Sequence, residues 1–187
     1  KVVQAAFLTY DGQKVELVKY LLRHNDIPSL VIFCSTKLKV KQLTKELQAQ
    51  KLNAKQISSD LEQTERESIL NEFKARTLTI LVATDVISRG IDIDNIDMVI
   101  NYDVPNDAED YIHRIGRTAR ASSEGEAITF INEDDQSRFK RIEDLIEKEI
   151  RKVPLPESIG EGPEYNPKKF RGRGGNFGGK RNFKKRR

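Results

Sequence analysis

The chain has 187 residues, of which 37% are hydrophobic and 33% charged, and its formal net charge is +4. That length suits one domain with an appendage, and no apolar run approaches the roughly 18 residues that a membrane span needs. The single cysteine, Cys34, excludes an intramolecular disulfide framework and a cysteine-based metal cage, and it favours a reducing, cytoplasmic compartment. Because the chain opens on Lys1 without a methionine or a signal segment, we expect a fragment of a longer protein.

Short apolar runs rich in β-forming residues alternate with longer amphipathic stretches. The runs predict strands, and the stretches predict helices with apolar residues at helical spacing. In chain order we expect strands at 2–8, 30–34, 54–57, 78–83, 98–102 and 127–131, and helices at 9–24, 36–51, 62–75, from the cap Asp107 onward, and at 134–151. This alternation predicts an α/β fold: a parallel sheet with helices on both faces.

The charge is divided unevenly along the chain. Residues 1–150 carry 21 Lys+Arg against 26 Asp+Glu, a net charge of −5, whereas residues 151–187 carry 12 against 3, a net charge of +9. The basic end is rich in Gly, Lys and Arg with interspersed Phe, so it buries too little apolar surface to offset its ordering entropy. We therefore expect a folded domain over 1–152 and a disordered Pro/Gly-rich linker and basic tail over 153–187.

Polar residues follow the carboxyl ends of the predicted strands, where parallel sheets usually bind ligands. Hydroxyls, arginines and a glycine in such places suit phosphate oxygens. Taken singly, each has an ordinary structural explanation: Thr36 and Thr84 are typical helix caps, His113 is typical of a structural or solvated histidine, and Asp92 is typical of a loop acid. Their combination is what indicates function.

Three arginines recur at intervals of three residues. Arg114, Arg117 and Arg120 would lie near one face of a helix, where their guanidinium groups could converge on a polyanion. Surface arginines paired with glutamate are the ordinary alternative. Apolar neighbours such as Tyr111 and Ile112, and the lack of glutamates four residues from Arg114 and Arg117, weaken it.

Four motifs together resemble those of one enzyme family. They are VIFCST at 31–36, QTER at 63–66, TDVISRGID at 84–92 and HRIGRTAR at 113–120. In order and spacing they resemble motifs IV, IVa, V and VI in the second RecA-like domain of the DEAD-box RNA helicases. NYDVP at 101–105 is similar to the stretch between motifs V and VI, and SSDLEQ at 58–63 is similar to the bacterial RhlE-type subgroup. The resemblance covers about residues 1–150.

The resemblance implies roles for particular residues. Arg117 and Arg120 would be arginine fingers that reach the γ-phosphate of ATP across an interdomain cleft, and His113 would couple that site to the Asp-Glu-Ala-Asp segment. Gly90 and Asp92 would also contact ATP, Asp92 at its ribose. The RNA sugar-phosphate backbone would be held by Thr36, Gln63, Arg66, Thr84, Arg89 and Gly90.

Motifs that the family carries on its first RecA-like domain are missing from this sequence. There is no G-x-x-x-x-G-K-[ST] loop, no Asp-Glu-Ala-Asp and no Ser-Ala-Thr. The resemblance therefore implies the C-terminal half of the enzyme. It also implies ATP with Mg²⁺ as cofactor, the metal ligands lying on the first domain, which would be a partner of this one.

The basic tail calls for a separate hypothesis. Cations such as Arg171 and Arg173 can neutralise phosphates, and an aromatic ring such as Phe177 can stack on bases. We expect weak, salt-sensitive RNA anchoring; a solubilising end or, in a eukaryote, a nuclear address are the alternatives.

These observations lead us to expect an ATP-dependent RNA helicase or RNA-protein remodeller, inactive as this isolated half. An RNA-annealing module that acts through its tail without ATPase, and a DNA translocase, are the competing hypotheses. Backbone binding is compatible with ribosomal precursors, decaying messengers and cold-trapped structures as substrates, with partners in ribosome assembly or RNA decay and no membrane.

Overall fold

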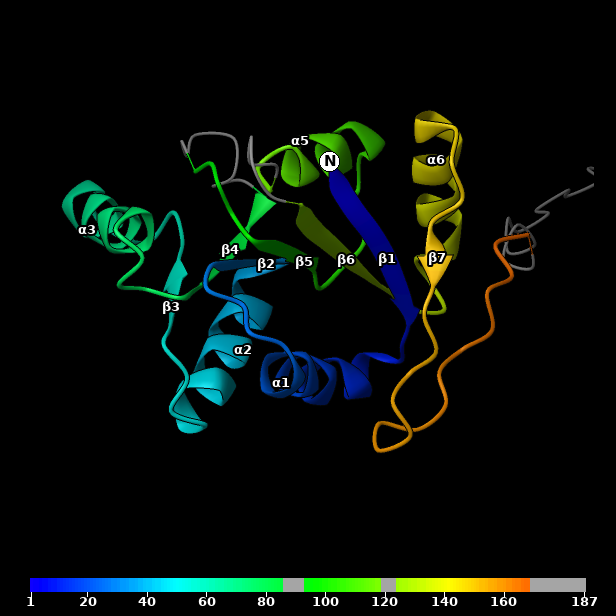
Figure 1. The fold of residues 1–187 in the computed structure, drawn as a ribbon, viewed down its shortest axis with the longest axis horizontal. Helices are drawn as coiled ribbons and strands as arrows, with labels where there is room; N and C mark the ends of the chain where they lie inside the picture. Colours follow the sequence, from blue (N-terminus) through cyan, green and yellow to red (C-terminus); the bar gives the residue numbers. More distant parts are fainter. Residues whose placement is uncertain (86–92, 119–123, 169–187) are drawn as a thin grey trace, which may run out of the picture.

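The computed structural model describes residues 1–85, 93–118 and 124–168. These residues form one sheet with the strand order β3-β4-β2-β5-β6-β1-β7, and every neighbouring pair is parallel (Figure 1). The predicted α/β fold with a parallel sheet is confirmed. No helix in these described ranges is long and apolar enough to span a membrane. The strands are β1 (Val2–Leu8), β2 (Leu30–Cys34), β3 (Ala54–Ile57), β4 (Ile80–Thr84), β5 (Met98–Asn101), β6 (Gly125–Ile131) and β7 (Arg151–Lys152); the helices are the 3-10 turn η1 (Asp11–Gln13), α1 (Lys14–His24), α2 (Lys37–Ala49), α3 (Gln63–Lys74), α5 (Ala108–Ile115) and α6 (Gln136–Ile146).

The central strand β2 organises the core. All five of its residues are buried, and alternate side chains enter two different apolar clusters. Ile32 packs with residues of α1 and α2 on one face, whereas Phe33 packs with residues of α3 on the other. Cys34 is buried and free, and burial raises the pKa of its thiol, so it serves as a small hydrophobe. A run that is apolar at every position is thus explained by cover on both faces.

Two helices begin with the caps expected from their sequences. The Thr36 hydroxyl oxygen accepts a hydrogen bond from the Lys39 backbone N–H at 3.2 Å at the start of α2. At the start of α5, the Asp107 carboxylate accepts one from the Glu109 N–H at 3.0 Å. Each cap satisfies a backbone donor that the first helical turn leaves unpaired.

The last helix is shorter than the sequence indicated. The apolar spacing predicted a helix over 134–151, but α6 ends at Ile146, where Glu147 adopts a left-handed conformation with φ of 54°. The chain then turns back, buries Ile150 and forms β7 beside β1. Ile150 falls at helical spacing from α6 although it belongs to the returning segment, so periodicity alone gave the wrong boundary.

Residues 153–168, which we call the docked segment, pack on the domain and do not form the disordered linker that their composition indicated. The Val153 N–H donates to the Ala6 carbonyl at 2.7 Å, and the Tyr165 hydroxyl donates to Glu143 at 2.6 Å. The Gln136 side chain holds the segment through the Glu164 carbonyl and the N–H of residue 166, each at 2.6 Å. Tertiary hydrogen bonds and apolar anchors thus order a segment of low intrinsic propensity. The basic tail at 169–187 lies outside the described residues.

Candidate functional site

The carboxyl edge of the sheet gathers most of the residues predicted to act on a ligand. Because β3, β4, β2 and β5 are consecutive in the sheet, the segments that follow them lie along one edge. Thr84 ends β4 opposite Cys34 of β2 and is buried. Thr36 follows β2, and Gln63 follows β3. The convergence expected from strand order is therefore present in the fold.

Thr36 stands at the open end of β2. Its side chain is exposed, and its oxygen accepts the cap hydrogen bond from α2, so the hydroxyl hydrogen is not used in that cap. The neighbouring Lys37 forms an ion pair at 2.8 Å with Asp60, which precedes α3. The cap and a phosphate contact are thus compatible uses of the same hydroxyl, one as acceptor and the other as donor.

The first turn of α3 carries a small polar cluster. The Arg66 Nη2 donates to the Gln63 side-chain oxygen at 2.8 Å, and the Gln63 amide donates to Glu67 at 3.0 Å. The Nε–H of Arg66 is buried and has no acceptor in the described part of the chain. The guanidinium is therefore oriented by Gln63 while it retains donor capacity for an anionic ligand.

Arg114 is turned into the protein. It is only 4% exposed, donates to the Asn101 side-chain oxygen at 2.7 Å and to Asp85 just beyond β4, and lies 4.6 Å from the centre of the Phe33 ring. Burial lowers its pKa to about 9, so it remains charged at neutral pH. Through Asp85, Arg114 links α5 to the residue that follows β4. Arg114 and Arg117 both line one cavity, but the Arg114 guanidinium is already engaged by Asn101 and Asp85.

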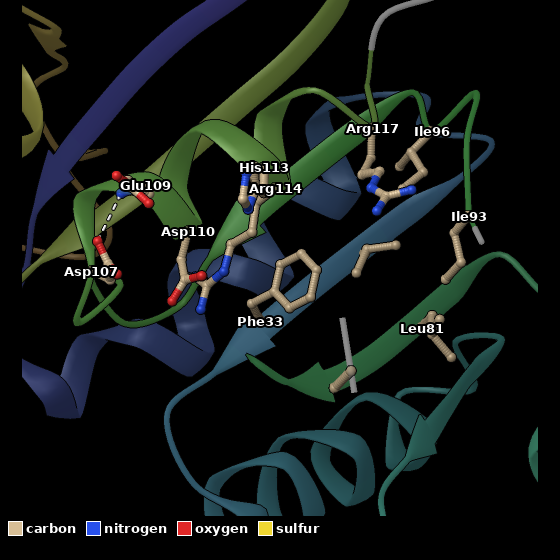
Figure 2. Close-up of a pocket in the computed structure, with 12 residues that line it drawn as sticks. Phe33, Leu81, Ile93, Ile96, Asp107, Glu109, Asp110, His113, Arg114 and Arg117 are labelled. Carbon is tan, nitrogen blue, oxygen red and sulfur yellow. Dashed lines mark hydrogen bonds between the residues drawn. The ribbon is translucent and has the colours of Figure 1, made fainter. Parts of the chain in front are cut away.

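Arg117 lies at the rim of a cavity of about 410 Å³ beneath α5, beside Ile96 (Figure 2). Its Nη1 is 3.5 Å from the Asp94 carboxylate, and the two side chains are 36% and 64% exposed. A surface ion pair of this kind contributes only about 0–1 kcal/mol. Arg117 can therefore exchange Asp94 for a phosphate at little cost.

The remainder of the cavity is divided between an apolar floor and a polar rim. Phe33 of β2 and Leu81 of β4 form part of the floor, whereas His113 of α5 is exposed at the rim (Figure 2). No group of three or more His, Cys, Asp or Glu side chains that could hold a metal occurs within the three described ranges. The polar rim is mixed, because Asp107, Glu109 and Asp110 line the same cavity. Arg117 supplies a cationic donor there that suits phosphate oxygens.

Asp103 is a functional candidate that the sequence analysis did not select. Its carboxylate accepts hydrogen bonds from Lys14 at 3.0 Å, Lys39 at 2.8 Å and the Ser35 N–H at 2.7 Å. These donors lower its pKa to about 2 against the opposing effect of burial. The signal in the sequence was weak, because it was a single lysine, Lys14, at the first position of an amphipathic helix. In the structure Lys14 is 1% exposed and is the partner of Asp103.

Several predicted residues cannot be placed in this geometry. Some of the predicted ATP and RNA contacts in 84–92 and 113–120 lie outside the described ranges. All of the predicted contacts in the tail lie outside them. Those outside are Arg89, Gly90, Asp92, Arg120, Arg171, Arg173 and Phe177.

One known protein family matches the part of the chain that forms most of this edge. The helicase conserved C-terminal domain family matches residues 13–122, a span that includes α1 through α5. The chain belongs to this family. The helicase C-terminal domain thus contains both Arg114, which is buried, and Arg117, which is at the rim.

Curated relatives of the domain are named RNA helicases. An ATP-dependent RNA helicase eIF4A from Meyerozyma guilliermondii is 42% identical over 135 residues, which are 72% of this chain and 34% of that protein. An ATP-dependent rRNA helicase RRP3 from Scheffersomyces stipitis is 35% identical over 190 residues, which are 92% and 39%. The helicase C-terminal domain thus spans little more than a third of the length of these relatives. Both are eukaryotic, so they give no support to the predicted bacterial RhlE-type subgroup.

Solved structures show the same fold. Escherichia coli DEAD-box protein SrmB bound to RraA has a TM-score of 0.80 at 26% identity, covering 89% of this chain and 98% of that one. A DEAD box protein from Methanococcus jannaschii has a TM-score of 0.75 at 36% identity, covering 81% and 42%. Saccharomyces cerevisiae Dbp5 bound to RNA and ADP BeF3 has a TM-score of 0.74 at 29% identity, covering 81% and 41%. The predicted DEAD-box C-terminal, RecA-like fold is confirmed.

Proposed function

We propose that this domain is the C-terminal half of an ATP-dependent RNA helicase and supplies an arginine finger to ATP held on a first RecA-like domain. The observation that carries the proposal is the contrast between two arginines at the end of α5: Arg114, in the helix, is buried, whereas Arg117, just after the helix, contacts the exposed Asp94 at 3.5 Å. A guanidinium next to a fixed helix with an exchangeable partner can stabilise charge on a transferring phosphoryl group. Arg120 is the second proposed finger, and His113 couples the two domains.

The same edge would hold RNA by its backbone. Thr36 and Thr84 offer hydroxyls, and Arg66, oriented by Gln63, offers charged donors. Such groups bind phosphates with little regard for base identity. We add Arg89 and Gly90 to the proposed RNA surface, and we assign Gly90 and Asp92 to the ATP site. In the tail, the residues proposed to anchor RNA are Arg171, Arg173 and Phe177.

The whole protein would require a first domain. We place most of the ATP contacts and all ligands of Mg²⁺ there, because the phosphate-binding loop and the Asp-Glu-Ala-Asp segment of the family are missing from this sequence. Dividing the site between domains makes hydrolysis conditional on closure, and RNA bound across both domains would favour closure too. We also propose a cytoplasmic location, since a single cysteine fits a reducing compartment, and RNA maturation or decay as the process that the protein serves.

The test is reconstitution of the full enzyme with its first domain. The full-length protein should hydrolyse ATP in response to RNA, and Arg117→Ala should lower that rate by about 10³-fold or more. The matched control is Arg141→Ala on α6, which removes an exposed arginine that does not line the cavity. If Arg117→Ala and the control retained the same RNA-stimulated rate, the finger assignment would be wrong.

Two further measurements separate the competing functions. An annealing module would pair complementary RNA strands without nucleotide and would lose that activity when residues 168–187 are removed. A DNA translocase would be stimulated as strongly by DNA as by RNA of equal length. The proposal expects nucleotide dependence and a preference for RNA.

A further inference from the structure

A second cationic surface lies beyond the carboxyl edge, in a groove of about 320 Å³ between α2, β3 and α3. We call it the lysine groove, and Lys41, Lys45 and Lys55 line it together with Gln48 and Gln56. Figure 1 places β3, the edge strand of the sheet, between these two helices. No carboxylate of the described residues lines the groove.

The two sides of α2 differ in how their charges are satisfied. On the side toward α1, Glu46 pairs with Lys19 at 3.2 Å. On the groove side, Lys41 and Lys45 are exposed and form no ion pair within the described chain. Lys55 is paired with Glu72 at 2.8 Å but remains 46% exposed. In a domain whose first 150 residues carry a net charge of −5, this is a local concentration of unpaired positive charge.

The lysine groove continues the proposed RNA surface. Lys37, Lys41 and Lys45 recur every four residues, so they share one side of α2 and follow one another by about 6 Å along the helix axis. The first of them adjoins Thr36 and is joined to Asp60, ahead of α3, at 2.8 Å. The row of lysines therefore runs from the edge that holds Thr36 into the groove.

The apolar part of the groove adds a second feature. Leu61 and Ile69 are partly buried against the core and form its apolar lining beside the amides of Gln48 and Gln56. Lysine stems and apolar side chains together can contact sugars, whereas the ammonium groups can contact phosphates. The Gln48 amide donates to the Ala54 carbonyl at 2.9 Å and so helps to hold α2 against β3. The combination fits a polyanionic strand better than a single small anion.

We propose that the lysine groove binds the backbone of single-stranded RNA where the strand leaves the carboxyl edge, so that Lys41 and Lys45 extend the RNA footprint of this domain. The inference rests on the proposed RNA binding and deepens it. It predicts a footprint that depends on strand length: a short strand occupies only the edge, and a longer one also reaches the groove.

The test compares two double variants of the full 187-residue chain. Lys41→Gln/Lys45→Gln removes the groove charges, and Lys140→Gln/Lys148→Gln removes two charges from the region of α6, so the net charge is identical. Binding of an oligouridine hexamer and an octadecamer is followed by fluorescence anisotropy over a salt series. The groove variant should bind the octadecamer about tenfold more weakly at low salt, with a salt slope smaller by about 1.4, and should bind the hexamer as the control does. Acetylation of Lys41 and Lys45 should be blocked by the octadecamer only.

Each other outcome counts against the groove. Equal losses in the two variants, or an equal loss for both oligonucleotides, would overturn it while leaving the proposed function intact. If the octadecamer bound normally but polyglutamate lost affinity for the groove variant, an acidic protein segment would be the occupant. If the wild-type chain bound no RNA of either length, the groove and the RNA-binding part of the proposed function would both fail.

Discussion

Arg114 and Arg117 are three residues apart, yet their surroundings give them opposite properties. Arg114 reaches Asp85 and Asn101 inside the domain, so removing it leaves the buried Asn101 side-chain oxygen without this donor. Arg117 forms an ion pair with Asp94, which is 64% exposed and readily hydrated. The first arginine is therefore a component of the fold, and the second is available to a ligand.

Arg114→Met should destabilise the domain. The change removes the ion pair to Asp85 and leaves the buried Asn101 oxygen without a donor, so the free energy of unfolding should fall by about 3 kcal/mol. Urea unfolding measures the loss, and Arg141→Met on the surface of α6 should change it by less than about 0.5 kcal/mol. The conservative variant Arg114→Lys keeps the charge and should lose less; a loss equal to that of Arg114→Met would mean that the ion pair is not its origin.

Asp103 should make stability depend on pH in the acid range. Its folded pKa of about 2 lies below its ordinary value of 3.8 because Lys14, Lys39 and the Ser35 N–H stabilise the carboxylate. The resulting stabilisation, about 2 kcal/mol, is complete above pH 5 and is lost as the pH falls toward 2. The difference in unfolding free energy between wild type and Asp103→Asn should therefore shrink from pH 6 to pH 2. Asp134→Asn, an exposed control, should show no such trend; a constant difference for Asp103→Asn would contradict the assignment.

At the scale of elements, the sequence predicted the features that depend on local residue pattern. It did not predict the features that depend on contacts with residues distant in the chain. The strand β2 was predictable because each of its residues is apolar, and the caps at Thr36 and Asp107 because such residues open helices. The end of α6 was not, because Ile150 keeps helical spacing after the chain has turned at Glu147. Likewise the inward direction of Arg114 depends on Asp85, which lies 29 residues earlier and faces it only once β4 and α5 have packed.

The docked segment should detach when its closest approach to the sheet is obstructed. A Cβ at Gly162 would overlap the Leu8 carbonyl oxygen, whereas one at Gly12 would meet nothing within 4 Å. Gly162→Ala should therefore weaken docking by about 1–3 kcal/mol, and Gly12→Ala should not. Trypsin cleavage after Lys152, followed by mass spectrometry, should be faster in Gly162→Ala only. Equal cleavage of the two variants would mean that the segment tolerates displacement from Leu8.

At the scale of the whole molecule, the uneven charge assigns long-range attraction of RNA to the basic end and direct contact with RNA to the domain. Residues 1–150 carry −5 and residues 151–187 carry +9. A net negative body repels a polyanion at distances beyond direct contact, even though its carboxyl edge presents donors for phosphates. The basic end can offset that repulsion. Because the docked segment is bonded to Gln136, the chain leaves the domain at a fixed place before residue 169.

Removing charge from the tail should therefore slow RNA association more than it accelerates dissociation. In the full chain, Arg171→Gln/Arg173→Gln should lower the association rate constant for an oligouridine at low salt, and the difference should narrow as salt screens the field. Phe177→Ala should instead raise the dissociation rate at every salt concentration, because loss of base stacking removes about 1–3 kcal/mol without changing charge. Stopped-flow fluorescence separates the two rates, and Lys140→Gln/Lys148→Gln is the control of equal net charge. If that control slowed association as much as the tail variant, total charge rather than its position along the chain would govern the encounter.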